Sequence, residues 1–177
     1  MEILPDPQRT TIAAIASAPG TGAVSLVRIS GPAAIRIADE ATDGKAAMLL
    51  PRTVRYCQIK DANGDTIDDG LMTIFHGPKS YTGEDSVEFT GHGGILVTRE
   101  ILTRFLACGA VVAGPGEFTQ RAFLNGKLDL TQAEGVMDLI SAQTRLSLRA
   151  ARSQLEGTLG RRTTEARNQL LETLAHL

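Results

Sequence analysis

The hydrophobic pattern of this chain changes at residues 115–134, and the change limits the folds that its 177 residues can adopt. Before this segment, short stretches rich in Ile, Val and Ala alternate with helical patterns, whereas after it apolar residues recur only at helical spacing. The segment itself contains Pro115-Gly116, several charged side chains and Asn125-Gly126, a pair typical of a turn or helix stop. We therefore predict an α+β region before this segment and an α-helical region after it.

The first region is expected to form a small mixed sheet with two packed helices. Apolar stretches and turn residues predict strands over residues 10–17, 23–30, 53–60, 66–75, 85–91 and 110–113. One helix is predicted to begin near Pro32. A second is predicted over Ile95–Ala107, where one apolar stripe recurs at helical spacing and Gly109 follows as a left-handed stop.

The sequence after the 115–134 segment predicts only helices. Thr131 and Glu134 have the spacing of a capping box that begins a helix. A further helix is predicted from about Arg145 toward the end of the chain, weakened locally at Gly157 and Gly160. Its last turns have an apolar face without an evident partner, so we expect the sequence to stop at a domain edge of a longer protein.

Composition excludes several classes of function. Aromatic residues make up 4% of the chain and Trp is absent, which disfavours a stacking platform for single-stranded nucleic acid. The net charge is −2, so the chain as a whole is not a polyanion binder by bulk charge. Residues 145–177 contain six Arg and three Glu, and this basic helical part could contact RNA. A solvated helix surface explains that charge better when charge is the only criterion.

No metal site is expected, because Cys57 and Cys108 are distant in sequence and no His lies near either one at ligand spacing. Both cysteines fall in apolar stretches and are predicted to be buried thiols. The chain has no signal-peptide pattern and no apolar run long enough for a membrane span, which predicts a cytoplasmic protein.

The sequence lacks several common catalytic and nucleotide-binding motifs. The GxxxxGK[ST] pattern of a P-loop does not occur, and neither do HExxH or GxSxG. Residues 20–25 approach the GxGxxG pattern but end in Ser, and they lead into a predicted strand rather than a helix. No catalytic residue is therefore assigned in this chain.

Three charged residues remain as candidate ligand-binding groups. Arg28 lies inside an apolar strand, where it must find a partner, enter a cleft or face water from an edge. Glu88 lies on the polar side of its predicted strand, and Lys127 follows Asn-Gly, where it could bind a ligand or only satisfy helix carbonyls. Gly93-Gly94 could receive an anion at a helix start, although a tight turn is the better interpretation. Together the charged residues suit a ligand with an amide-like edge and carboxylates.

Five sequence motifs occur in a distinctive order. They read ASAPGTGA at 16–23, VRISG at 27–31, GPKSYTGED at 77–85, HGG at 92–94 and PGEFTQRAFLNGKLDLTQAE at 115–134. This set resembles the MnmE (TrmE) family of bacterial and mitochondrial tRNA modification GTPases over nearly the whole chain.

The resemblance implies a domain organisation. It makes residues 1–120 a folate-binding and dimerisation domain, similar to the folate-binding part of glycine-cleavage T-protein. Residues 121–177 would be the first helices of a helical domain. The family's G domain, inserted in that helical domain, has no counterpart here, so GTP, Mg²⁺ and potassium would bind only outside this chain. The chain by itself is therefore not expected to be a GTPase.

The resemblance also implies a ligand and a function. In the family, 5-formyltetrahydrofolate is held at positions matched here by Arg28, Glu88 and Lys127. Glu88 would accept hydrogen bonds from the pterin, and the two cations would pair with anionic or carbonyl groups. The homodimeric whole protein, with its flavin-dependent partner MnmG, adds an aminomethyl-type group to carbon 5 of the tRNA wobble uridine. A tetrahydrofolate one-carbon unit, such as 5,10-methylene-tetrahydrofolate, would be the source. The alternative is a stand-alone folate-binding and dimerisation module without catalysis.

Overall fold

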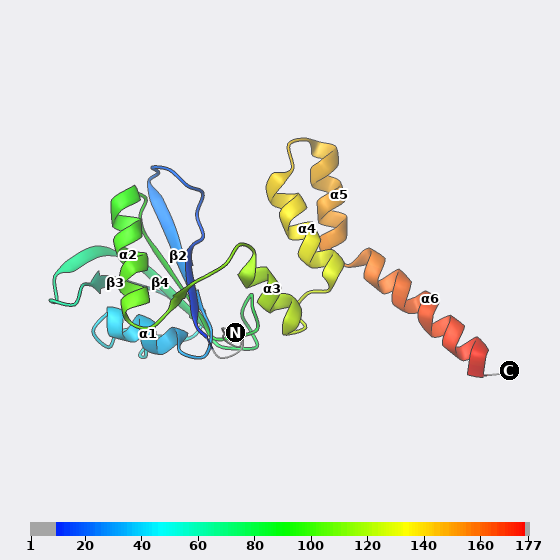
Figure 1. Cartoon of the computed structure of the whole chain (residues 1–177), viewed down its shortest axis with the longest axis horizontal. Helices are drawn as coiled ribbons and strands as arrows, with labels where there is room; N and C mark the ends of the chain where they lie inside the picture. Colours follow the sequence, from blue (N-terminus) through cyan, green and yellow to red (C-terminus); the bar gives the residue numbers. More distant parts are fainter. Residues whose placement is uncertain (1–9, 176–177) are drawn as a thin grey trace, which may run out of the picture. The chain divides into compact units, whose positions relative to one another are not determined.

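The computed structural model describes residues 10–175, except for the side chain of Leu159. The chain forms two compact units that divide between Arg121 and Ala122 (Figure 1). The first unit contains a sheet and two helices, and the second is helical. The α+β fold predicted from the hydrophobic pattern is confirmed.

The first unit is built on one six-stranded sheet with the order β3-β4-β5-β2-β1-β6. Its strands are β1 (Ile12–Ile15), β2 (Val24–Ser30), β3 (Val54–Lys60), β4 (Thr66–Phe75), β5 (Ser86–His92) and β6 (Val111–Val112). Neighbouring strands are antiparallel except β1 and β6, which are parallel. The sheet is therefore mixed, as expected.

Two helices, α1 (Ala34–Ala41) and α2 (Ile95–Ala107), share one core with one face of the sheet. Side chains alternate between the faces of a strand, so every second residue of the central strands points toward these helices. The sheet contributes fully buried side chains to this core: Val27, Ile29, Met72, Ile74, Val87 and Phe89. The residues between them, including Arg28 and Glu88, therefore lie on the opposite face.

The bounds of α2 agree with the predicted helix, and its stop is the one expected at Gly109. This glycine has a φ of +105°, which L side chains rarely adopt. Its N–H donates to the carbonyl of Leu106, and the N–H of Ala110 donates to that of Phe105. These two bonds form a Schellman motif, which satisfies carbonyl groups at the helix end.

Residues 115–134 are more helical than predicted. They contain α3 (Glu117–Leu124), and α4 (Leu130–Ser141) begins within them. The expected capping box of Thr131 and Glu134 is wrong. The N-cap is Asp129, which accepts from the Gln132 N–H at 2.8 Å, while the Gln132 side chain accepts from the Asp129 N–H at 2.9 Å. Asp is a stronger N-cap than Thr, and it lies directly before the first helical residue.

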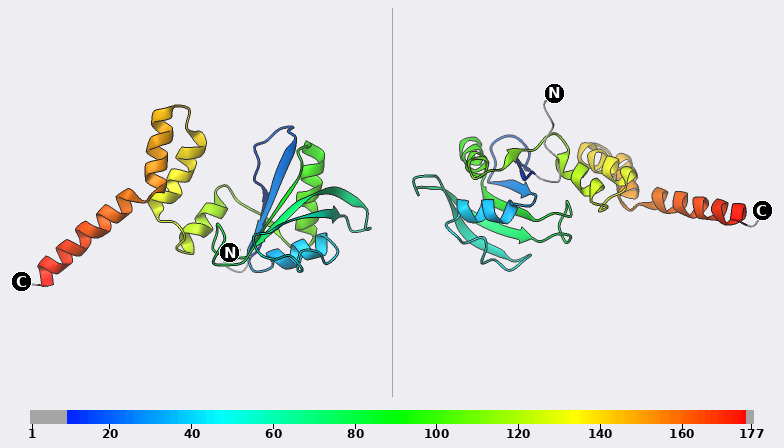
Figure 2. Two further views of the ribbon diagram at one scale, coloured as in Figure 1. Left: turned by 180° about the vertical axis from the view of Figure 1, so that it is seen from behind. Right: turned by 60° about the horizontal axis from the view of Figure 1, so that its bottom comes forward.

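The second unit continues with α5 (Arg145–Leu155) and α6 (Thr158–Ala175), shown from two further sides in Figure 2. The single helix predicted from Arg145 is interrupted at Gly157, which has a φ of +67°. A left-handed residue cannot continue an α-helix, so α6 begins anew. Within residues 10–175, no helix combines the length and apolar character needed to cross a membrane.

Candidate functional site

Arg28 and Glu88 form an ion pair on the sheet face that points away from α1 and α2. They lie on the neighbouring strands β2 and β5 and are directly opposite each other in the register. The Nε and Nη2 atoms of Arg28 donate to Oε1 of Glu88 at 2.9 and 2.7 Å. Each side chain is about one quarter exposed. Two of the three predicted site residues are thus brought together by one strand pairing.

The pair leaves one carboxylate oxygen available. Both bonds from Arg28 end on Oε1 of Glu88, and no described residue donates a hydrogen bond to Oε2. A carboxylate can accept about four hydrogen bonds, so Glu88 retains capacity to bind donors of a ligand while it holds the guanidinium.

Two aromatic rings contact Arg28, and neither was identified as a site residue from the sequence. The guanidinium carbon lies 5.3 Å from the ring centre of Tyr81 and 5.5 Å from that of Phe118. These are cation–π distances. The Tyr81 hydroxyl also lies 2.9 Å from Oγ1 of Thr119, which links the β4–β5 loop to α3. Both rings lie within the family motifs, which is the signal that could have identified them.

A buried arginine holds this loop and α3 in place. Arg121 is 2% exposed and donates to the carbonyl of Thr10 at 2.7 Å. It also forms ion pairs with Glu84 of the loop at 3.2 Å and with Glu117 of α3 at 2.8 Å. Glu84 in turn accepts from the hydroxyl of Ser30 on β2 at 2.8 Å. This network fixes the segments that carry Tyr81 and Phe118.

Lys127, the third predicted site residue, lies in the second unit directly after α3. Gly126 has a φ of +68°, its N–H donates to the carbonyl of Phe123, and the N–H of Lys127 donates to that of Ala122 at 2.8 Å. The Asn125-Gly126 pair is thus the helix stop that the sequence indicated. The Lys127 side chain is exposed.

Gly93 is required by a close approach of two backbone segments. A Cβ atom at this position would lie 2.5 Å from the carbonyl oxygen of Gly22 and 2.8 Å from that of Val24. The Gly22 N–H donates to the Gly93 carbonyl at 2.9 Å. These contacts support the tight-turn interpretation of Gly93-Gly94 over an anion site.

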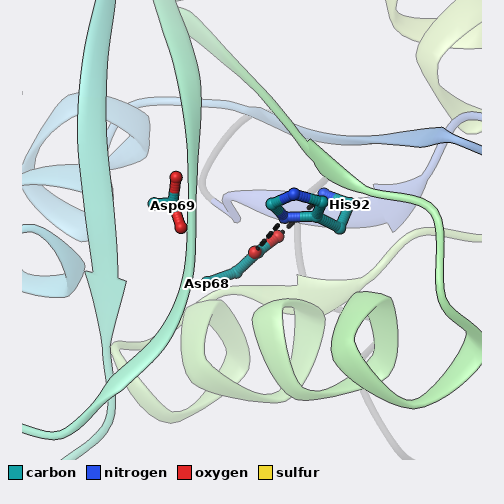
Figure 3. Close-up of side chains that lie close together, drawn as sticks. All are labelled: Asp68, Asp69 and His92. Carbon is teal, nitrogen blue, oxygen red and sulfur yellow. Dashed lines mark hydrogen bonds and ion pairs between the residues drawn. The ribbon is translucent and has the colours of Figure 1, made fainter.

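His92, the last residue of β5, forms hydrogen bonds with Asp68 of β4 (Figure 3). Asp68 is 7% exposed, and its two oxygens accept from the His92 N–H at 2.8 Å and from Nδ1 at 2.6 Å. This side-chain hydrogen bond raises the pKa of His92. Asp69 completes a group of three residues with ligand atoms within 4.8 Å of one another. Because Asp68 is engaged by His92 through both oxygens, the group serves to join the two strands.

Both cysteines are buried, as predicted. Burial raises the pKa of Cys57 to about 11 and also raises that of Cys108. Thiols with raised pKa values are poor nucleophiles and poor metal ligands at neutral pH. The cysteines therefore act as core residues.

Comparison with known proteins gives a consistent result over the chain. The family described as "GTP-binding protein TrmE N-terminus" matches residues 11–127, and "MnmE helical domain" matches residues 130–177. A protein named tRNA modification GTPase MnmE from Akkermansia muciniphila is 50% identical over 97% of this chain. Proteins of the same name from Lactobacillus acidophilus and Acetivibrio thermocellus are each 47% identical over 94% of it.

The chain spans 37–38% of the length of these three relatives. The first family match covers most of the sheet-containing unit and the second covers most of the helical unit. The chain therefore belongs to the MnmE (TrmE) family of tRNA modification GTPases, and it matches the N-terminal and helical regions of that family.

Proposed function

We propose that the first unit binds a reduced folate, 5-formyltetrahydrofolate or 5,10-methylene-tetrahydrofolate, at the Arg28–Glu88 pair. The observation that carries the proposal is Oε2 of Glu88, which has no donor from the described residues while Oε1 holds Arg28. A pterin presents an amino group beside a ring N–H, and this pair of donors suits a carboxylate.

The surroundings of the pair suit the rest of such a ligand. Tyr81 and Phe118 offer flat apolar surfaces beside the guanidinium, and aromatic rings favour offset stacking on one another. Arg28 supplies a positive charge for a carbonyl or carboxylate group. Lys127 is proposed as a second cation for the same ligand, on the basis of the family motif that contains it.

For the whole protein, we propose a role in modifying tRNA. Together with MnmG, it would add an aminomethyl-type group to carbon 5 of the wobble uridine, and the bound folate would supply the one-carbon unit. The relatives are named as tRNA modification GTPases, and the activity in that name would come from a G domain that binds GTP, Mg²⁺ and potassium. The sequence of this chain contains no P-loop motif of its own. A cytoplasmic location fits this role.

The first unit is also proposed to form a homodimer. Val54, Tyr56 and Leu71 lie on the same sheet face as Arg28 and are 63%, 60% and 48% exposed. Neighbouring large apolar side chains with this exposure are typical of an interface. The second candidate function is a folate-binding and dimerisation module without catalysis, which the missing P-loop motif favours.

Calorimetry with 5-formyltetrahydrofolate tests the folate site. We expect the chain to bind and the Glu88→Ala variant to lose most of the affinity. Charged hydrogen bonds contribute about 1.5–3 kcal/mol, which corresponds to a loss of roughly 10- to 150-fold. Glu100→Ala removes an exposed carboxylate from α2 and is the matched control, with unchanged binding. Equal affinities of the two variants would refute this site.

A further inference from the structure

Helix α5 has a stripe of three arginines and contains no acidic residue. Arg145, Arg149 and Arg152 follow the spacing i, i+4, i+7, which at about 100° per residue places them within about 60° of one another around the helix axis. With a rise of about 1.5 Å per residue, they extend along roughly 10 Å of the helix. All three side chains are exposed. We refer to these three residues as the α5 stripe.

The opposite face of α5 packs against α4. A Cβ atom at Gly135 of α4 would lie 3.0 Å from Cβ of Gln154 and 3.4 Å from the carbonyl oxygen of Ala151. At about 100° per residue, Gln154 lies about half a turn and Ala151 about a third of a turn around the helix from the middle of the α5 stripe. The two helices run side by side in both figures that show them (Figures 1 and 2). The α5 stripe therefore faces away from the helix that packs against α5.

The positive charges of the α5 stripe are weakly compensated. Arg152 has one ion-pair partner, Glu156, at 3.6 Å, and both side chains are more than 60% exposed. Such exposed pairs contribute little. Among the residues that the structure describes, Arg145 and Arg149 have no ion-pair partner. Three guanidinium groups are thus available to an external anion.

Helix stability does not account for this arrangement. Like charges at i, i+4 and i, i+3 repel each other on a helix surface. Arg145 is also the first residue of α5, where the helix dipole favours a negative charge. Arg152, in the last turn, has a favourable position for a positive charge, so the unfavourable charges are those of Arg145 and Arg149.

We propose that the α5 stripe binds the sugar-phosphate backbone of RNA. A straight row of guanidinium groups matches a regular row of phosphates, which arginine binds in bidentate geometry. The 11-residue helix has no aromatic side chain that could stack on a base, so contact with the backbone and little dependence on sequence are expected. The choice of tRNA as the RNA rests on the proposed function.

The salt dependence of tRNA binding tests the proposal. Fluorescence anisotropy with a labelled tRNA transcript would compare the chain with the triple variant Arg145→Gln, Arg149→Gln, Arg152→Gln. Each lost phosphate contact lowers the slope of log affinity against log salt by about one unit. Between about 50 and 200 mM salt, the affinity of the unmodified chain should therefore fall roughly 20- to 40-fold more than that of the variant. Equal slopes would overturn the proposal.

A charge-matched control shows whether the position of the arginines matters or only the number of positive charges removed. The variant Lys45→Gln, Arg55→Gln, Arg99→Gln removes three exposed positive charges from the first unit, and it should retain the slope of the unmodified chain. The α5 variant should unfold at the same or a higher temperature, because it relieves repulsion between like charges. If the slope of log affinity against log salt fell by the same amount in the control variant, only net charge would matter. That result would also overturn the proposal.

Two further measurements separate the alternatives. If the chain binds polyglutamate through the α5 stripe but does not bind tRNA, the partner is an acidic protein surface and the RNA proposal is wrong. Calorimetry with 5-formyltetrahydrofolate reports on the proposed folate site, which contains no residue of the α5 stripe. A chain that fails to bind folate but shows the slope difference on tRNA would refute the folate proposal and support this one.

Discussion

At the scale of single residues, Arg121 has the clearest energetic role. It is 2% exposed and is held by Glu84, Glu117 and the carbonyl of Thr10. Arg121→Met would keep much of the volume but leave two carboxylates without their partner. Breaking a buried ion pair in this way costs about 3–5 kcal/mol, so we expect a loss of that order in urea unfolding.

Arg36→Met is the matched control for Arg121. Arg36 pairs with Glu40 at 3.2 Å on the surface of α1, where both side chains are about half exposed or more. An exposed pair of this kind is worth about 0.2–1 kcal/mol at most. If both variants lost the same stability, the network around Arg121 would not hold the loop and α3 as described.

The sequence predicted part of the candidate site at this scale. Alternation along β5 placed Glu88 on a polar face, and the apolar surroundings of Arg28 left a partner, a cleft or a water-facing edge as alternatives. Their pairing depends on the register of two strands separated by 60 positions in sequence, which no local pattern encodes. The burial of Arg121 could not be predicted either, because its partners come from three separate segments.

At the scale of elements, the link between β4 and β5 is sensitive to pH. The hydrogen bond that Asp68 accepts from the His92 ring raises the pKa of His92 above its ordinary value of 6.5. His92 therefore binds a proton more tightly in the folded chain than in the unfolded chain. Its contribution to stability is fully present below about pH 6.5 and is lost as the pH rises through the raised pKa. Relative to His92→Gln, the urea midpoint of the chain should be higher at about pH 5.5 than at about pH 8.5.

A titration of the imidazole by NMR checks the cause. Asp68→Asn should lower the pKa of His92 because it removes the negative charge and replaces one of the two acceptor oxygens with an NH2 group. Asp69→Asn is the control on the same strand, and it should lower the pKa less because its charge is a smaller contribution. A pKa of His92 that is the same in both variants would contradict the role assigned to Asp68.

The elements themselves were predictable to different degrees. Helix α2 was predicted with its correct bounds because its apolar stripe and Gly109 are local signals. The eight-residue α3 was missed, since its apolar pattern is short and it begins beside Pro115-Gly116. The cap of α4 was misplaced by two residues because Asp129 and Thr131 both begin a plausible capping motif.

At the scale of the whole molecule, the sequence predicts that this chain does not hydrolyse GTP by itself. The GxxxxGK[ST] pattern of a P-loop does not occur in its sequence. We expect no release of phosphate from GTP above that of buffer, as measured by a colorimetric phosphate assay. GTPase activity that elutes together with the chain in a single gel-filtration peak would contradict this expectation.

The strand order of the sheet could not be obtained from sequence patterns. Apolar stretches and turn residues predicted which segments are strands, but not that β1 lies between β2 and β6. The parallel β1–β6 pair joins residues that are about a hundred positions apart, and its two-residue partner strand has little pattern of its own.

This pairing also has a consequence for the order in which the protein forms during synthesis. One edge of β1 can pair with β2 early, because Ile12 and Ser30 emerge close together. Its other edge must wait for Val111, which at roughly 5–20 residues per second is translated about 5–20 s later. During that interval one edge of β1 in the nascent chain has no strand to pair with, and its backbone N–H and C=O groups on that side are exposed.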